Sequence, residues 1–394
     1  MQDMKISMIL IRYGEIGLKS PKTRISWEKL LISNIKSMME LNNIDYERIT
    51  FSPTRGRIFI KGHTTDKLVQ GLKKVSGITS FSEVEETKSE LKLIEEAVIK
   101  KAKEFLKNND SFALRVNRVG DHPYTSIEVA QKIGREILDQ LTEKEISVNL
   151  DNPDKEIYID IRDKKSYIFT EKIAGMGGLP IGSQGKLVSL LSGGIDSPVA
   201  TWLMMKRGCV ILPVFFDAQP YSSEKQNEKI RRLIKLIRKY DPRKNYYYYV
   251  CNHGDNLKYL IENAPSRYTC LLCKRLMYRI AEVIAKKENA KGIITGENMG
   301  QVASQTLYNL EILDNVINLP IYRPVIGFDK QEIIQIAQNI GTFDISTETA
   351  DICTAVPESP IIRGSINKVK NAESDINIKK LVKKTTENIR KIQI

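Results

Sequence analysis

The stretch LLSGGIDSPVA, residues Leu190 to Ala200, is the strongest chemical signal in the sequence. An apolar run at 186–191 leads into a turn with two adjacent glycines, and Pro198 then opens a helix, where its missing N–H costs no hydrogen bond. The glycines let backbone N–H groups approach an anion, and the helix N-terminus favours negative charge. The hydroxyls of Ser192 and Ser197 add further donors. The stretch therefore predicts a phosphate-binding turn at the carboxyl edge of a sheet.

The residues that follow this turn alternate between apolar strands and helical stretches. The strands are expected at 209–216, 246–250 and 292–296, each followed by a helix. This alternation is typical of a doubly wound parallel sheet covered by helices, so we expect an α/β domain over 187–394. The Lys-rich C-terminal end is weakly patterned and predicts either a surface helix or a loose tail.

The first half of the chain predicts two smaller α+β domains. Strand, helix and strand patterns at 6–13, 27–41 and 57–62 indicate the first domain, over 1–62. Further helical and alternating patterns indicate the second, over 63–171. Residues 172–186 are rich in glycine and predict a linker or a loop that makes backbone contacts.

Composition limits the class of protein. Five cysteines in 394 residues argue against a secreted disulfide framework. No signal pattern and no apolar run near the ~20 residues of a membrane span is present, so we expect a cytoplasmic location and no membrane contact. The net charge is +13, with +5 on residues 1–62, −1 on 63–186 and +9 on 187–394. This excess suggests a nucleic acid partner, although it is also compatible with ordinary solubility charge.

The phosphate turn resembles the SGGxDS loop of the ATP pyrophosphatases, also called PP-loop enzymes. Further segments have family-like sequences: FALRVNRVGDHPYTSIEVA at 112–130, TGENMGQVASQTLYNL at 295–310 and RPVIGFDKQEII at 323–334. With them, the chain resembles the tRNA 4-thiouridine synthetases, or tRNA sulfurtransferases, over nearly its whole length. The resemblance implies a ferredoxin-like domain at 1–62, a THUMP RNA-binding domain at 63–171, a Gly-rich linker at 172–186 and a PP-loop ATP pyrophosphatase domain at 187–394.

The resemblance also implies an activity. The C4 oxygen of uridine 8 in tRNA would be adenylated by ATP, and a sulfur nucleophile would then displace AMP to give 4-thiouridine. Asp196 would handle Mg²⁺ and the pyrophosphate end of ATP, as suits a hard cation, and Lys330 would lie near the reacting phosphate. The residues expected to bind ATP are Leu190, Leu191, Ser192, Gly193, Gly194, Asp196, Ser197, Phe215, Phe216, Lys274, Gly296 and Gln305.

A closely spaced cysteine pair suggests how sulfur is delivered. Cys270 and Cys273 stand at a predicted helix start, and Cys353 falls at the position of the family's catalytic cysteine. Many relatives end in a rhodanese domain that carries the sulfur, whereas this chain stops at Ile394, so we expect a different route. In the favoured hypothesis the three cysteines ligate a 4Fe–4S cluster, since soft thiolates suit iron. A persulfide relay without metal, and a structural zinc half-site or buried thiols, are the alternatives. Cys209 and Cys251 are interpreted as core residues.

Basic residues in two regions are candidates for contact with RNA. Residues 225–244 predict an amphipathic helix with Arg231 and Arg238 on its basic face, where the alternative is simply a solvated surface. In the N-terminal half the candidates are Arg55, Arg57, Arg115 and Arg118. The family resemblance further implies a homodimer, with inorganic sulfide or a cysteine desulfurase as sulfur donor.

Other functions compete with this interpretation. One is a different PP-loop enzyme, such as a 2-thiolating tRNA enzyme or a synthetase acting on a small acid, which would lack the THUMP-like segment. Another is a non-catalytic RNA-binding protein with a decayed ATP site, against which the intact SGGIDS loop argues. A THUMP methyltransferase is disfavoured because no cofactor loop of that type is seen.

Overall fold

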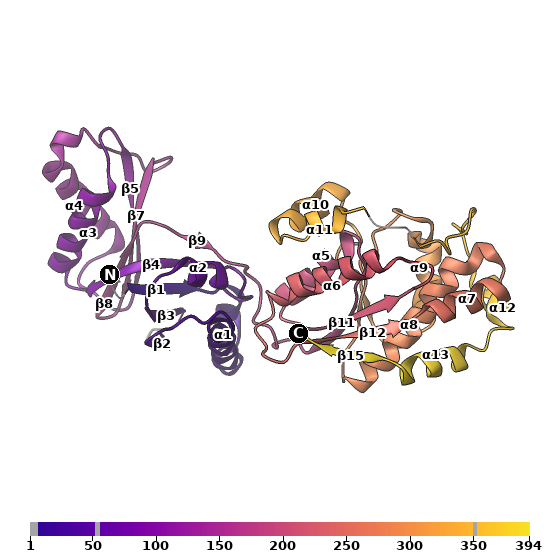
Figure 1. The fold of residues 1–394 in the computed structure, drawn as a ribbon. Helices are drawn as coiled ribbons and strands as arrows, with labels where there is room; N and C mark the ends of the chain where they lie inside the picture. The colour runs from indigo at the N-terminus through magenta and orange to yellow at the C-terminus, as the bar shows by residue number, and fades with distance from the viewer. Residues whose placement is uncertain (1–6, 52–55, 350–352) are drawn as a thin grey trace. The chain divides into compact units, whose positions relative to one another are not determined.

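The computed structural model describes residues 7–51, 56–349 and 353–394, which form two compact units (Figure 1). The first unit runs to Gly178 and the second begins at Leu179. The two predicted N-terminal α+β segments lie together in the first unit, because one strand is shared between their sheets.

The first half of this unit is an antiparallel sheet with the strand order of a ferredoxin-like fold, β2-β3-β1-β4. Two helices cover one face and bury a core that includes Ile11, Ile35 and Ile58. The elements are β1 (Ser7–Arg12), α1 (Pro21–Leu41), β2 (Arg48–Phe51), β3 (Arg57–Gly62), α2 (Asp66–Leu72) and β4 (Ser80–Lys88). Strand β4 was not anticipated, because it holds three exposed glutamates and its large apolar residues, Phe81 and Val84, do not alternate.

The second half extends the same sheet. β4 pairs with β1 through Ser80–Val84 and with β8 through Glu85–Lys88, so one strand joins both halves. β5 pairs in parallel with β6 and β7, and β7 is antiparallel to β8. The elements are α3 (Leu91–Phe105), β5 (Ser111–Val119), α4 (Ser126–Gln140), β6 (Ser147–Val148), β7 (Lys155–Arg162), β8 (Lys165–Phe169) and β9 (Ile173–Ala174).

The Gly-rich segment is tied to both units by backbone hydrogen bonds. β9 pairs with β4, and a Cβ on Gly175 would lie 2.3 Å from the carbonyl oxygen of Ile78. Beyond Gly178, the N–H of Leu179 donates to the carbonyl of Lys206, and that of Gly182 donates to Gly208. Each half of the segment therefore belongs to the unit next to it.

The second unit is a doubly wound sheet, as predicted. Its strand order is β14-β13-β10-β11-β12-β15, parallel except for β15. The chain leaves β10 in one direction through β11 and β12 and returns on the other side through β13, so strand order reverses beside β10. The strands are β10 (Lys186–Leu190), β11 (Val210–Asp217), β12 (Tyr247–Asn252), β13 (Ile293–Ile294), β14 (Ile321–Tyr322) and β15 (Arg390–Gln393).

Helices cover both faces of this sheet (Figure 1). One core packs against α6 through Leu233 and Ile234, and the other packs against α8 through Leu272 and Leu276. The helices are α5 (Asp196–Lys206), α6 (Glu224–Arg238), α7 (Gly254–Asn263), α8 (Thr269–Lys287), α9 (Leu307–Asp314), α10 (Lys330–Asn339), α11 (Phe343–Thr347), α12 (Ile366–Glu373) and α13 (Ile378–Glu387).

The C-terminal end is folded, so the surface helix was the correct alternative and the loose tail was wrong. α13 buries Leu381 and Thr385 against the unit, and β15 then pairs antiparallel with β12. Among the described residues, no helix has the length and apolar character needed to cross a membrane.

Candidate active site

The phosphate turn lies where β10 ends and α5 begins, beside the reversal of strand order. In a doubly wound sheet, ligands bind at the carboxyl end of the strands at such a point. The N–H of Ser192 donates to the hydroxyl oxygen of Ser197 at 2.9 Å, and the two hydroxyls lie 3.0 Å apart. These bonds close the turn on itself. The backbone N–H groups at the start of α5 are thereby held in a fixed arrangement.

Close backbone contacts require glycine at one position around this turn, and a second glycine meets only the end of a flexible side chain. A Cβ on Gly296, which follows β13, would lie 2.5 Å from both the Cα and the backbone nitrogen of Ser197. A Cβ on Gly193 would lie 2.5 Å from the Nε2 of Gln226. The segment after β13 therefore packs directly on the phosphate turn, and only glycine allows that approach.

A cavity of about 370 Å³ opens over the turn. Of the residues predicted to bind ATP, all except Gly193 and Gly194 line it, and these two lie in the turn itself. The lining residues among the predicted set are Leu190, Leu191, Ser192, Asp196, Ser197, Phe215, Phe216, Lys274, Gly296 and Gln305. Its volume is within the range of small-molecule sites. The structure thus brings segments from β10, β11, α8 and the loop after β13 to one cavity.

Asp196 and Lys330 meet at the turn, although 134 residues separate them. The Nζ of Lys330 lies 2.7 Å from Oδ1 of Asp196. Lys330 is the first residue of α10, which is capped by the side chain of Asp329. Gln301 joins the pair: with its amide oriented to satisfy both partners, its oxygen accepts from Lys330 at 2.9 Å and its nitrogen donates to Asp196 at 3.3 Å. Gln301 was not predicted, although it stands inside the family-like segment 295–310.

Lys274 is held against the cavity by a buried carboxylate. Glu297 lies 3.2 Å from the Nζ of Lys274, accepts from the Nε of Arg323 at 2.7 Å and accepts from the hydroxyl of Tyr278 at 2.8 Å. Burial alone would raise the pKa of Glu297, but the charges of Lys274 and Arg323 outweigh it and hold the pKa below its usual value. Glu297 was missed in the sequence, although it stands inside the family-like segment 295–310.

The three candidate cysteines lie around the first turn of α8 and the cavity wall. Cys270 and Cys273 occupy that turn, as predicted, and Cys353 lines the cavity. Burial is the main cause that raises the pKa of the Cys270 and Cys273 thiols, and the charge of a Cys353 thiolate raises both further. The three cysteines thus lie in one neighbourhood, at the start of α8 and in the wall of the cavity that α8 also lines.

The three thiols are the kind of ligand that an iron–sulfur cluster takes. Within residues 7–51, 56–349 and 353–394, no three His, Cys, Asp or Glu side chains converge as a single-ion site would require. A cluster spaces its thiolates more widely than one ion does, and three cysteine thiolates are the ligand type it prefers. All five cysteines, each in the described part of the chain, are free thiols. Cys209 and Cys251 are buried, which confirms their interpretation as core residues.

His253 stands behind the cysteine pair and was not anticipated. It is fully buried, and its Nε2 lies 3.2 Å from the Sγ of Cys273. Burial lowers its pKa to about 4, so the ring is neutral at physiological pH. A single histidine after a Tyr-rich strand gave no local signal of this contact.

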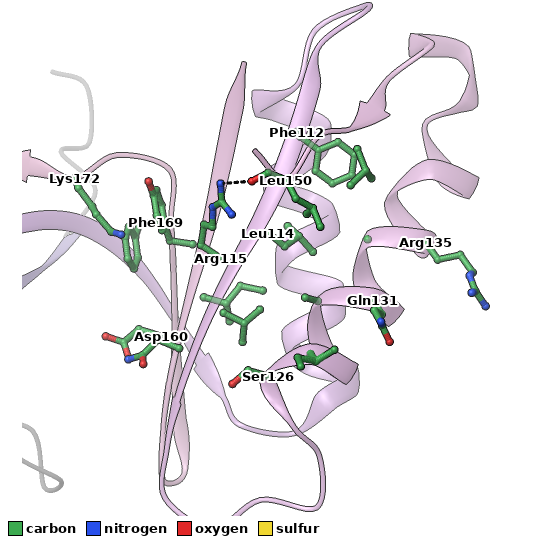
Figure 2. A pocket seen from close by; sticks show the side chains of 18 of the residues that line it. Phe112, Leu114, Arg115, Ser126, Gln131, Arg135, Leu150, Asp160, Phe169 and Lys172 are labelled. Carbon is green, nitrogen blue, oxygen red and sulfur yellow. Dashed lines mark hydrogen bonds between the residues drawn. The ribbon is translucent and has the colours of Figure 1, made fainter. Parts of the chain in front are cut away.

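The first unit carries a second hollow, of about 880 Å³, between α4 and the sheet (Figure 2). Its wall is largely apolar and includes the exposed Ile127, Val148 and Leu150. Four cationic residues and one acidic residue also line it. The cationic residues are Arg12, Arg115, Arg135 and Lys172. The hollow thus offers both apolar surface and excess positive charge.

Arg12 lies in the wall of the hollow with one donor atom left unsatisfied. Burial, followed by the charge of Arg57, lowers its pKa to about 10. Its Nη2 atom is buried and has no hydrogen-bond partner among the described residues. Asp160, the one carboxylate among the described residues that line the hollow, is paired with Arg57 at 3.0 Å and Arg162 at 3.0 Å. Positive charge therefore exceeds negative charge at this place.

The predicted RNA contacts are found in different settings. Arg115 lies at the hollow, paired with Glu156 at 2.6 Å and donating to the carbonyl of Leu150 (Figure 2). Arg118 donates to the carbonyl of Gly120. Arg57 is largely buried in its pair with Asp160, and Arg55 lies outside the described residues.

The α6 arginines both have partners within their own unit. Arg231 is paired with Glu224 at 2.6 Å and Glu228 at 3.3 Å. Arg238 donates to the carbonyls of Asp241 and Arg243 just beyond the helix. The predicted apolar face of α6 is buried, as expected.

Three protein-family profiles match successive segments of the chain. The profile described as "Thiamine biosynthesis protein (ThiI)" matches residues 182–378, half of the chain. The ThiI ferredoxin-like domain matches 8–82 and the THUMP domain matches 88–171. The chain belongs to the ThiI family. This confirms the family resemblance and its three-part fold.

Related proteins align with this ThiI-family protein over nearly its whole length. A "probable tRNA sulfurtransferase" of Methanosarcina mazei is 41% identical, covering 96% of this chain and 94% of that protein. A protein of the same name from Thermococcus kodakarensis is 40% identical, covering 91% and 94%. The solved structure of a 4-thiouridine synthetase–RNA complex with bound ATP is 32% identical, with a TM-score of 0.86 and coverage of 99% and 100%.

Proposed function

We propose that this protein is an ATP-dependent tRNA sulfurtransferase that converts uridine 8 of tRNA to 4-thiouridine. The observation that carries the proposal is the cavity beside the reversal of strand order. The phosphate turn and Cys353 line this cavity, and so does Asp196, which is paired with Lys330. The related proteins named as sulfurtransferases, and the related synthetase solved with RNA and ATP, support it.

In the first step, the C4 oxygen of the uracil attacks the α-phosphorus of ATP, and pyrophosphate leaves. The N–H groups at the start of α5 face the phosphates, and Lys330 places a positive charge beside them. Asp196 supplies an oxygen ligand for Mg²⁺. Gln301 hydrogen-bonds to both the Asp196 carboxylate and the Lys330 ammonium and so keeps the two groups side by side. These groups stabilise charge that develops on the phosphates.

In the second step, a sulfur nucleophile attacks C4 and AMP leaves with the original oxygen. Cys353 lies in the cavity wall, so this chemistry and ATP share one site. We propose that Cys270, Cys273 and Cys353 hold a 4Fe–4S cluster, which when bound would leave one iron free to hold a hydrosulfide. Inorganic sulfide or a cysteine desulfurase would supply the sulfur. A persulfide relay through the same cysteines is the alternative.

We propose that the hollow in the first unit contacts the RNA. Its cations suit phosphates, and its apolar wall suits unstacked bases. The Arg231–Arg238 face of α6 is a weaker candidate, because both arginines already have partners. A cytoplasmic homodimer remains part of the proposal, following the family expectation.

The activity is tested with purified protein, ATP, Mg²⁺, sulfide and a tRNA transcript under anaerobic conditions. The proposal expects one AMP released for each 4-thiouridine formed, and neither product with a transcript in which uridine 8 is replaced by cytidine. If AMP never forms, or if thiolation persists on the replaced transcript, the proposal is wrong.

The cluster is tested separately by iron and labile-sulfide analysis. We expect about four irons per chain, and loss of iron when Cys270, Cys273 or Cys353 is changed to serine. Cys209→Ser is the matched control, because Cys209 is a buried core thiol. Full thiolation by an iron-free protein would favour the persulfide relay instead.

A further inference from the structure

A chain of buried hydrogen bonds runs from the C-terminal helix to Cys273. The hydroxyl of Thr385 lies 2.9 Å from the carbonyl oxygen of Leu381 and 2.9 Å from the Nδ2 of Asn256. Nδ2 of Asn256 lies 3.2 Å from Nδ1 of His253, and Nε2 of His253 lies 3.2 Å from Sγ of Cys273. Thr385, Asn256 and His253 are all buried, at 5%, 2% and 0% exposure, so water does not complete these bonds.

The donor and acceptor of each hydrogen bond in this series can be assigned by starting from the carbonyl of Leu381. A carbonyl oxygen only accepts, so the single hydroxyl proton of Thr385 is donated to Leu381. The Thr385 oxygen must then accept from Asn256, which fixes Nδ2 as the amide nitrogen. The second Nδ2 proton points to His253, so Nδ1 of the ring accepts and carries no proton. The ring proton therefore sits on Nε2 and faces the sulfur.

We propose that His253 is a positioning residue for sulfur transfer: its Nε2–H donates to the Cys273 sulfur, in a tautomer set from α13 through Asn256 and Thr385. The role of His253 in sulfur transfer rests on the proposed function, whereas the hydrogen bonds themselves do not depend on it. A hydrogen bond of this kind fixes the side chain of Cys273 and withdraws electron density from its sulfur. For a cluster ligand this raises the reduction potential.

The arrangement gives the C-terminal helix a role in the active site. The match to the ThiI profile ends at residue 378, the first residue of α13. Thr385 reaches the chain of bonds because α13 packs against α8, the helix that carries Cys273, and because β15 anchors the end of the chain to β12. A change on this helix is therefore expected to alter the sulfur site without touching ATP.

The first test uses the wild-type, metal-free protein and no activity measurement. The chain has three histidines, so ¹⁵N-histidine labelling gives few ring signals, and a His253→Gln variant assigns those of His253. We expect a neutral ring with the proton on Nε2 and slow exchange of that proton with solvent. A proton on Nδ1, or a doubly protonated ring at neutral pH, would overturn the inference.

The second test removes the hydrogen bond of Thr385, which is the member of the series farthest from Cys273. Thr385→Val removes the hydroxyl with little change of shape, and we expect mixed tautomer signals and a more negative cluster potential. Thr386→Val is the matched control, because Thr386 makes the same 2.9 Å bond to a helix carbonyl without reaching Asn256. At His253 itself, Gln should preserve the potential better than Phe, since its amide can still donate. Unchanged tautomer signals in Thr385→Val, together with equal cluster potentials in all these proteins, would overturn the inference.

The two proposals fail in different ways. A wild-type protein that shows the Nε2 tautomer but neither binds iron nor thiolates tRNA would contradict the proposed function alone. An active enzyme with the proton on Nδ1 would contradict the role of His253 alone.

Discussion

Replacing Gly296 by alanine should damage the ATP site by a purely steric route. The added Cβ would lie 2.5 Å from the backbone nitrogen and Cα of Ser197 and 2.8 Å from the carbonyl carbon of Asp196. These neighbours are backbone atoms at the start of α5, so no side-chain rotation relieves the contact. The phosphate turn or the segment after β13 must move.

The size of the effect follows from the distance. Ordinary contact begins near 3.4 Å, so the turn must retreat by about 1 Å. A misplacement of that size costs about 100-fold in rate, or about 2.7 kcal/mol of transition-state stabilisation. Overpacking should also lower the free energy of unfolding by about 1–3 kcal/mol.

The assay is tRNA-dependent AMP formation as a function of ATP concentration, with unfolding followed in denaturant. Gly327→Ala is the matched control, since a Cβ there meets nothing within 4 Å and its backbone is unstrained. We expect Gly327→Ala to keep wild-type kinetics. If folded Gly296→Ala protein stays within about threefold of wild type in kcat/KM for ATP, the steric reasoning is refuted.

Three further predictions follow from other contacts. Lys330→Met should lower the rate of AMP formation by about 100-fold or more, because a charge beside the phosphates is lost, whereas the exposed Lys379→Met should not; equal rates would exclude a catalytic role for Lys330. Burial would raise the pKa of Glu373, but hydrogen bonds from Arg275 and Arg279 outweigh it and lower the pKa to about 2. Because the folded-state pKa lies below the unfolded one, Glu373→Gln should cost about 2 kcal/mol of stability above pH 4.5, and the difference should shrink as pH falls toward 2; a pH-independent difference in denaturant unfolding would contradict this. Arg12→Gln with Lys172→Gln should weaken tRNA binding and reduce its salt slope by about 2, while Lys92→Gln on α3 should change neither, and an unchanged slope would remove the hollow as an RNA site.

Local sequence was enough to predict most of the secondary structure and the phosphate turn. A glycine pair between an apolar strand and a proline-started helix restricts the backbone within one short segment, so its conformation is readable there. Strand β4 was not predicted because three of its nine residues are exposed glutamates. At the C-terminal end the sequence left a helix and a loose tail both open, because α13 becomes stable only through its contacts with the rest of the unit.

Family membership, the doubly wound sheet and the position of the phosphate turn could all be predicted from the amino-acid sequence, because each depends on patterns within short runs of neighbouring residues. The contacts between distant side chains emerge only in the folded protein: Lys330 with Asp196, Glu297 with Lys274, and His253 with Cys273. Parallel strands end at one edge of the sheet, so residues far apart in the chain converge there, and their partners depend on packing rather than on sequence spacing.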